Sequence, residues 1–397
     1  RYNTVNDSIV MKGKIPLIKY GEITITNAVI DLNTVENALV YSVIVDDIQN
    51  EQFQIPHTSL TGKAENNVIE YALQLQDDKG KERYFVAGTL EAKNGLNEVS
   101  LDSEKLVLNY NEWQMAADNL IRFGQQGIYA SNFDLSKGEN KLTIQSETSN
   151  LNAPIAIDFD NFEIETLTSF AQRSQLEMTG RINGNAKVRA INSTPIFTSD
   201  LTIENFTFKK DTVGTIAVQV NNEIANQYDA HITLTGQENQ VNLNGVYRSN
   251  DSSFDIKLLI DRLNMKSIQG FTMGAITQST GFLSGDFKIT GSTTNPSVIG
   301  ELQFNEVGFK VKQLASKFKS INDKISFTNT GIGFNNFSKP ILTSLDDIPL
   351  HPSDFGWIAE NEPFAFARSE IVAYAASETN ATRGNGEIDI AAKRAAK

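Results

Sequence analysis

The three histidines are the residues best suited to acid–base or metal chemistry, and their spacing supports neither. His57, His231 and His351 lie far apart in the sequence, so a zinc site or a catalytic triad would have to be assembled by the fold alone. The chain contains no Cys, which excludes disulfides, thiolate catalysis and Cys-based zinc sites. We therefore expect solvated histidines and no bound metal.

Acidic side chains gather in one short stretch, Asp158–Glu165. A calcium loop needs a Gly and regularly spaced oxygen ligands, and both are missing here, so the stretch is interpreted as the polar side and corner of a strand. Ser316 and Lys319 match the SxxK string of serine–lysine acyl enzymes, but the companion motifs are absent. No phosphate loop or dinucleotide fingerprint occurs. These observations predict a protein that is not an enzyme and uses no cofactor.

Composition narrows the class of partner. The chain has 397 residues, 40% of them hydrophobic, and a formal net charge of −13. Nucleic acids and anionic lipid surfaces attract clustered Lys and Arg, so this balance argues against both as main partners. No charged-then-apolar signal peptide and no run of about 18 apolar residues occurs. Any membrane anchor is therefore expected outside these residues.

The elements that would position functional residues are strands. Apolar and polar residues alternate in Val68–Gln76, Lys105–Tyr110, Asn140–Glu147, Ala230–Gly236 and Gln240–Tyr247, which places apolar side chains on one face of each segment. Short gaps rich in Gly, Asn, Asp and Ser separate them, as is typical of tight turns. The pattern predicts an all-β protein. Short helices are expected only within Asn111–Phe123, Lys312–Asp323 and Leu167–Ser174.

A sequence repeat gives the strongest indication of architecture. Shifting the chain by 101 residues aligns Ile155–Phe208 with Ile256–Phe309 without a gap, and ten of the 54 columns are identical. Gly180, Gly184 and Pro195 are among the residues that recur.

Each copy predicts a strand with a break at Asp160-Asn161 or Asp261-Arg262, a short helical piece, a Gly-x-x-x-Gly segment and two further strands around a Pro turn. A one-residue break in alternation is typical of a β-bulge. Repeated β units indicate a solenoid-like array, so we expect one elongated structure over residues 1–337. The Pro-rich, then Ala-rich stretch Ser338–Lys397 breaks the pattern and is left unassigned.

Three segments of the chain resemble the TamB family of translocation and assembly module proteins, which are relatives of the AsmA-like proteins. They are Val99–Glu147, GFLSGDFKITGSTTNPSVIGELQFNEVGFKV (Gly281–Val311) and KISFTNTGIGFNN (Lys324–Asn336). The resemblance covers Asn66–Phe337, and more loosely the residues before it. The Asn-rich strands fit a Bacteroidetes-type member, with this chain as a fragment.

The resemblance implies a fold, a location and partners. Family members form a β-taco, which is a long sheet curled into an open trough with an apolar inner surface. They lie in the periplasm of Gram-negative cells and bridge the inner and outer membranes, with an inner-membrane anchor that is not in this chain. They are thought to carry phospholipid to the outer membrane and to support assembly and secretion of its proteins, with a barrel partner of the TamA or BamA kind.

Strands with one apolar face predict which side chains would line such a trough, because that face must be covered by protein or by another apolar molecule. Acyl chains could cover it if the protein is a non-enzymatic lipid binder. Two alternatives remain open at this point: a structural or adhesive β-solenoid with a closed core, and a carbohydrate-active β-helix enzyme, for which only the pair Asp160 and Asp261 lies at a repeat-matched position. The predicted lining residues are Leu201, Ile203, Phe206, Phe208, Ile232, Leu234, Val241, Leu243, Ile256, Leu258, Ile260, Phe287, Ile289, Leu302, Phe304 and Phe309.

Overall fold

The computed structural model describes residues 2–3, 8–50, 53–169, 177–191, 195–222, 224–313 and 316–335. The chain forms two compact units: unit 1 is Arg1–Leu263 with Asp286–Ile299, and unit 2 is Asn264–Gly285 with Gly300–Lys397. The described parts of both consist almost entirely of strands, so the predicted all-β class is confirmed. The stretch Ser338–Lys397 lies outside the described residues.

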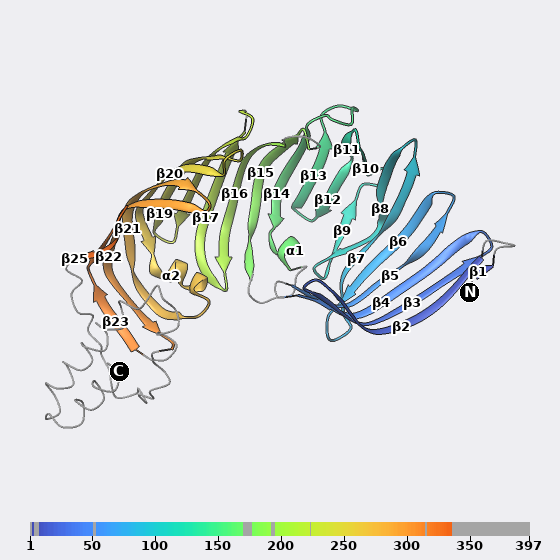
Figure 1. Cartoon of the computed structure of the whole chain (residues 1–397), viewed down its shortest axis with the longest axis horizontal. Helices are drawn as coiled ribbons and strands as arrows, with labels where there is room; N and C mark the ends of the chain where they lie inside the picture. Colours follow the sequence, from blue (N-terminus) through green and yellow to red (C-terminus); the bar gives the residue numbers. More distant parts are fainter. Residues whose placement is uncertain are drawn as a thin grey trace, which may run out of the picture. The chain divides into compact units, whose positions relative to one another are not determined.

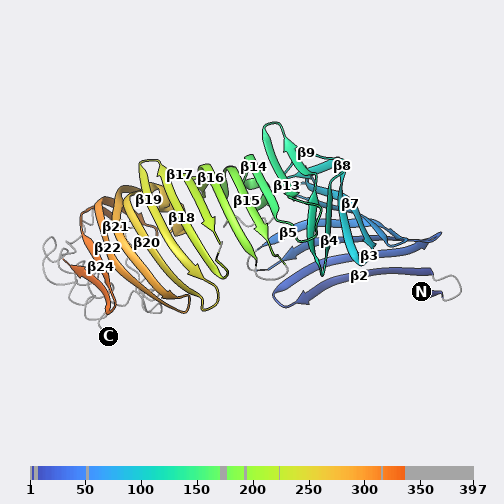
Figure 2. The same cartoon turned by 90° about the horizontal axis from the view of Figure 1, so that it is seen from above.

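Unit 1 opens with an antiparallel meander in which each strand pairs with the next along the chain (Figures 1 and 2). Tight turns join the strands. Asn66 and Asn67, for example, have φ of 50° and 65°, which is the left-handed pair that a type I′ hairpin turn requires. The strands are β1 (Tyr2–Asn3), β2 (Ser8–Tyr20), β3 (Ile23–Val35), β4 (Ala38–Gln49), β5 (Gln54–Glu65), β6 (Val68–Gln76), β7 (Glu82–Lys93) and β8 (Leu96–Leu108).

Short strands follow where a helix was predicted. One end of β8 pairs with β9 and the other with β10, so the expected helix within Asn111–Phe123 is wrong. Trp113 and Met115 are buried and alternate with exposed Glu112 and Gln114, which is the period of two of a strand. These residue types favour helix, but pairing with β8 outweighs that preference. The strands are β9 (Asn111–Met115), β10 (Leu120–Gly124), β11 (Gly127–Ser131), β12 (Phe133–Lys137) and β13 (Asn140–Ser146).

The meander of unit 1 continues from β13 to β20, again with each strand beside its successor. Among the described strands of unit 1, β2 pairs with β1 and β3, and no residue pairing joins it to β20, so this antiparallel sheet is open. Its elements are β14 (Ile155–Glu163), α1 (Glu165–Thr168), β15 (Met178–Arg189), β16 (Ile196–Phe208), β17 (Asp211–Asn221), β18 (Gln227–Gly236), β19 (Asn239–Arg248) and β20 (Ser253–Asn264).

Unit 2 contains a second strand where a helix was predicted. Residues within Lys312–Asp323 form β23, which pairs with β22 and places the Phe318 ring 5.2 Å from the Phe309 ring. A helix was also expected over Leu167–Ser174. Its first two residues, Leu167 and Thr168, are the end of α1, and residues 170–176 lie outside the described residues. The remaining elements, two of which span both units, are α2 (Met265–Ile268), η2 (Gln269–Thr272), β21 (Ile276–Ser292), β22 (Asn295–Val311), β23 (Ser316–Ile321), β24 (Lys324–Thr328) and β25 (Gly331–Asn335).

The two copies of the sequence repeat contain the same order of elements: β14, α1, β15, β16 in the first and β20, α2, β21, β22 in the second. The predicted breaks are β-bulges, because register shifts occur at Phe159/Phe162 and at Gln240/Val241, opposite Asp261. Later in each copy, Asn205 and Glu306 occupy equivalent positions and have φ of 51° and 50°. The repeat in sequence is therefore also a repeat in backbone geometry.

Two buried clusters form the core of unit 1. Phe162 is fully buried and lies in the first, where its ring is 5.5 Å from that of Trp113. The second consists of Ile164, Phe206, Phe208 and Val213, with Ile203 and Leu234 partly buried against it. Apolar burial of this kind is the main term that stabilises the fold.

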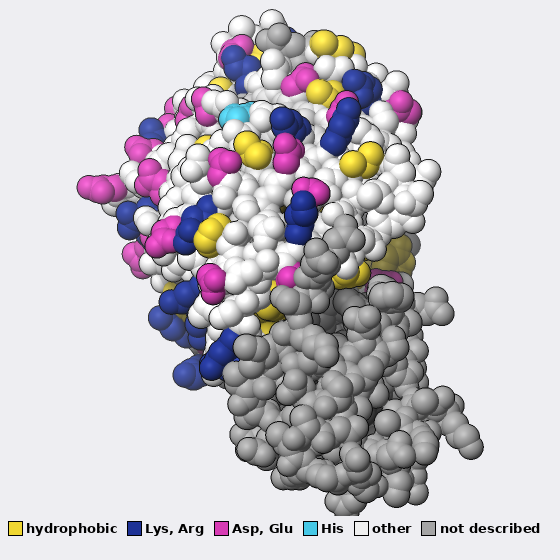
Figure 3. Space-filling view, turned by 90° about the vertical axis from the view of Figure 1, so that its left-hand side faces the viewer, with side chains coloured by type: hydrophobic (Ala, Val, Ile, Leu, Met, Phe, Trp, Pro, Cys, Tyr) yellow, Lys and Arg dark blue, Asp and Glu magenta, His cyan; other side chains and the backbone are white. Residues whose placement is uncertain are grey.

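Acidic and basic side chains are mixed over much of the surface. On the face shown in Figure 3, acidic and basic side chains lie next to one another over much of the described surface. Several of them form exposed ion pairs, such as Arg262 with Glu238 at 2.7 Å and Lys324 with Glu301 at 2.8 Å. Exposed pairs contribute little to stability, so their main effect is to keep the surface polar.

A buried tyrosine connects the meander to α1 and predicts how stability responds to alkali. The Tyr84 side chain is 3% exposed, and its hydroxyl donates a hydrogen bond to the Thr166 carbonyl oxygen at 3.3 Å. Burial raises the pKa of Tyr84 above its ordinary value of 10.0. The folded state therefore favours the neutral phenol, and this contribution is fully present below about pH 10 and is lost as the pH rises through the folded-state pKa.

We expect the free energy of unfolding, measured by urea titration, to fall above about pH 10 more steeply in the native chain than in Tyr84→Phe. At neutral pH this substitution removes the hydrogen bond to Thr166 and should cost about 1 kcal/mol. Equal alkaline slopes for the two proteins would show that Tyr84 does not carry this dependence.

Candidate functional site

Two rows of aliphatic side chains cross unit 1 in register, and together they form what we call the apolar face of β15–β20. In the first row, residues of successive strands are direct partners: Leu201, Val218, Ile232, Leu243 and Leu258. The second row lies two residues away along each strand, on the same face, and consists of Ile182, Ile203, Ile216, Leu234, Val241 and Ile260.

The exposure of the predicted lining residues separates a closed part of this face from an open one. Four of the sixteen are buried: Phe206, Phe208, Ile260 and Phe287. Phe206 and Phe208 lie beyond the bulge at Asn205, within the second core cluster. The other twelve are neither buried nor fully exposed. Protein packing therefore covers one end of the face and leaves the rows partly open to solvent.

The sixteen predicted lining residues do not all belong to the two rows of unit 1. Leu201, Ile203, Ile232, Leu234, Val241, Leu243, Leu258 and Ile260 make up most of the two rows, and Ile256 lies in the next row opposite Gly245. Phe287 and Ile289 belong to the β21 segment of unit 1. In unit 2, Phe309 contacts Phe318, and Leu302 pairs with Ile325; Phe304 lies between them on β22.

Sequence reasoning missed the strand that completes the rows. Ile216 and Val218 lie on β17, between Ile203 and Leu201 on one side and Leu234 and Ile232 on the other. The signal was present, since Thr215–Val220 alternates polar and apolar residues like the strands that were recognised. Only the register shows that these side chains belong to the same face.

A similar row was missed in the N-terminal strands. Ile30, Val43, Leu60, Leu73, Val86 and Leu106 are successive partners from β3 to β8. Leu60 is the most exposed member of this row, at 37%, and Leu106 is the least, at 3%, because it packs into the first core cluster. Apolar side chains thus continue across the meander, and cover by protein is most complete near Trp113.

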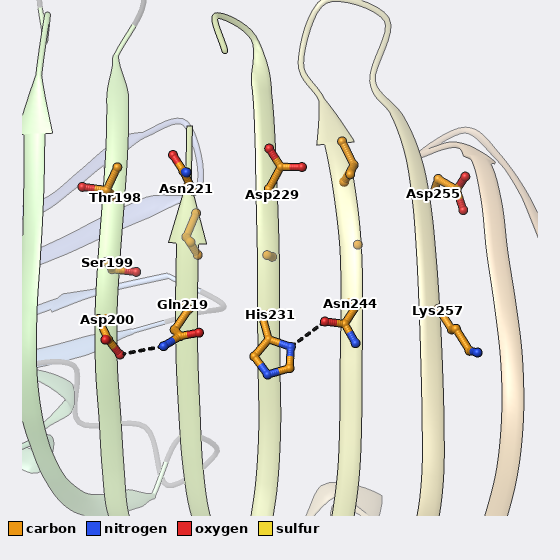
Figure 4. Close-up of a pocket in the computed structure, with 14 residues that line it drawn as sticks. Thr198, Ser199, Asp200, Gln219, Asn221, Asp229, His231, Asn244, Asp255 and Lys257 are labelled. Atoms are coloured by element: carbon orange, nitrogen blue, oxygen red, sulfur yellow. Dashed lines mark hydrogen bonds between the residues drawn. The ribbon is translucent and has the colours of Figure 1, made fainter. Parts of the chain in front are cut away.

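The face of β16–β20 opposite the two aliphatic rows is polar and carries a shallow hollow of about 820 Å³ (Figure 4). Its central row is also in register, and it alternates with the apolar rows along each strand. Within it, Gln219 donates a hydrogen bond to Asp200 at 3.3 Å, and His231 is hydrogen-bonded to Asn244. The row consists of Asp200, Gln219, His231, Asn244 and Lys257.

This polar row has the features of a hydrogen-bonded surface rather than of a reaction centre. His231 is partly exposed and is held by an amide, and no group of three or more His, Cys, Asp or Glu suited to a metal ion occurs among the described residues. His57 is exposed on β5, and His351 lies outside the described residues. The described histidines are thus separate in space as well as in sequence, and the apolar face is the better candidate for function.

Comparisons with protein-family models, with curated proteins and with solved structures found no match for this chain. Within the part of the chain that the structure describes, no helix has the length and apolar character needed to cross a membrane. The geometry of the two faces is therefore the main guide to function.

Proposed function

We propose that the chain is a non-enzymatic lipid-binding protein in which phospholipid acyl chains cover the apolar face of β15–β20. The observation that carries the proposal is the pair of unbroken aliphatic rows, which span five or more adjacent strands and remain partly exposed. Monomeric proteins rarely leave a large continuous apolar surface open unless it binds something.

An acyl chain suits such a surface in both chemistry and shape. The rows consist of Leu, Ile and Val, with no charged side chain among them, so a bound chain would make many weak contacts without direction. Each buried methylene contributes about 0.8 kcal/mol. Neighbouring strands present nearly equivalent apolar positions. A lipid that moves from one strand to the next therefore makes similar contacts and changes its binding free energy little.

The resemblance to the TamB family supports the same proposal and adds its setting. In that setting the open sheet is part of a β-taco trough in the periplasm, where it supports transport of phospholipid to the outer membrane and assembly of outer-membrane proteins with a TamA- or BamA-like barrel. The competing structural or adhesive solenoid would require protein, instead of lipid, to cover the same rows.

Native mass spectrometry of the full chain, purified from a Gram-negative host, tests the proposal. We expect additional masses of phospholipid on the folded protein, and their loss after delipidation under conditions that preserve the fold. A folded chain without lipid, which also takes up none from phospholipid vesicles, would overturn the proposal and favour the structural solenoid.

A further inference from the structure

Lysines gather in one part of unit 2 in which the sequence has no acidic residue. The segments 264–285 and 307–321 contain five Lys and no Asp or Glu, although the whole chain has a net charge of −13. Four of the lysines lie on or next to a single hairpin, β22–β23: Lys310, Lys312, Lys317 and Lys319.

The two segments are neighbours in space. The Lys312 amide donates to the Ala275 carbonyl oxygen at 2.9 Å, and the Lys317 ammonium donates to the Gln278 side chain at 3.3 Å. Lys310 and Lys317 are direct cross-strand partners, an arrangement of like charges that costs stability unless an anion offsets it. Among the described residues, none of the four hairpin lysines forms an ion pair, whereas Lys324 nearby is paired with Glu301.

Two acidic side chains, Glu306 and Asp323, lie closest to this cluster in sequence, and the four lysines outnumber them. Glu306 accepts a hydrogen bond from Asn322 at 2.7 Å, and Asp323 is 8% exposed. The four hairpin lysines therefore form a locally positive surface.

Two large apolar side chains project beside the lysines. Phe271 is 49% exposed and Met273 is 58% exposed, and both lie within four residues of Ala275, the backbone partner of Lys312. Basic residues next to exposed aromatic and aliphatic side chains are typical of surfaces that bind anionic membranes, where the charges meet headgroups and the apolar groups enter the acyl boundary.

We propose that the Lys310, Lys312, Lys317 and Lys319 cluster, with Phe271 and Met273, is a docking surface for anionic phospholipid headgroups at a membrane. The bases of a nucleic acid could stack on Phe271, but the aliphatic Met273 would have no role, so the membrane is the better match. The inference deepens the proposed lipid-binding function, on which it rests for the choice of partner.

Vesicle flotation of the full chain tests the proposal. We expect binding to vesicles that contain phosphatidylglycerol, little binding to pure phosphatidylcholine vesicles, and loss of binding as salt is raised. Replacement of the four hairpin lysines by Gln should weaken partitioning by about tenfold or more. The matched control replaces Lys14, Lys19, Lys209 and Lys210 by Gln, which makes the same change in net charge in unit 1 and should bind as the native chain does.

Phe271→Ser combined with Met273→Ser should also weaken binding, with the larger loss at high salt, where only the apolar contribution remains. Circular dichroism and thermal melting establish that each variant is folded. Equal loss in the control and the hairpin variant, or equal binding of the native chain to neutral vesicles, would overturn the proposal. So would lysine-dependent binding of a single-stranded DNA oligonucleotide by a chain that ignores vesicles.

The two functional proposals can fail separately. A chain that carries lipid in native mass spectra but does not bind anionic vesicles would remove the docking surface and leave the proposed function in place. A chain that binds vesicles through the hairpin lysines but carries no lipid would remove the proposed function instead.

Discussion

Leu243→Asp is expected to abolish acyl-chain binding at the centre of the apolar face while the chain remains folded. Leu243 lies between Ile232 and Leu258 in the first row and is only partly buried. In the lipid-free chain the new carboxylate can therefore reach water. An acyl chain over the row would bury that charge without a partner, at a cost of several kcal/mol, so bound phospholipid in native mass spectra should fall by at least about tenfold.

The neighbouring residue on the same strand supplies the control. Asn242 precedes Leu243 and faces the other side of β19, where the Asn244 amide donates to it at 2.7 Å. Asn242→Asp adds the same charge to the polar face and should leave lipid binding unchanged. Cooperative unfolding of Leu243→Asp, by several kcal/mol relative to the native chain, would instead mean that protein closes this row.

Phe162→Ala is expected to lower the free energy of unfolding by about 3–5 kcal/mol, a large fraction of the stability of a typical domain. Phe162 is fully buried, and its ring lies 5.5 Å from Trp113 and 5.9 Å from Phe159. Truncation would leave a cavity at the centre of the first core cluster, which the surrounding strands cannot close without shifting their register.

Urea denaturation followed by Trp fluorescence measures this effect, because Trp113 is 4% exposed and reports on the same cluster. Phe123→Ala is the control, since Phe123 is 36% exposed on β10 and should change stability far less. A Phe162→Ala variant within about 1 kcal/mol of the native chain would show that this cluster is not the core of unit 1.

Alternation and repetition in the sequence predicted the class of fold and the position of the bulges. Segments such as Ala230–Gly236 became strands because period-two patterns have few other solutions when turn residues flank them. The 101-residue repeat placed breaks at Asp160 and Asp261 that the structure shows as β-bulges. These are local properties, which a single sequence encodes directly.

Helix prediction failed where local preference and tertiary pairing disagreed. Asn111–Phe123 contains Glu, Gln, Met and Ala, which favour helix, yet β8 offers both of its ends for pairing and converts the segment to β9 and β10. The same occurs at β23, where contact with Phe309 outweighs the helix preference of a stretch that contains three Lys. Such long-range competition is not visible in the local pattern.

The two rows of the apolar face were only partly predictable from the sequence. Residues on β16, β18, β19 and β20 were named from alternation, whereas Ile216 and Val218 on β17 were missed because membership of a row depends on register. That these residues line a lipid site stays a prediction. Likewise, a net charge of −13 argued against anionic surfaces, yet charge acts locally, and four lysines gather on or next to the β22–β23 hairpin.

Photo-crosslinking from the two faces of β19 tests the central claim most directly. A photoreactive phenylalanine analogue is placed at Leu243 or at Asn242, two adjacent residues whose side chains point to opposite faces of the strand. In Gram-negative cells we predict phospholipid adducts at position 243 and none at position 242, detected by mass spectrometry of the purified protein. Equal adducts at both positions, or none at position 243 in the folded chain, would contradict the proposal that acyl chains cover the apolar face.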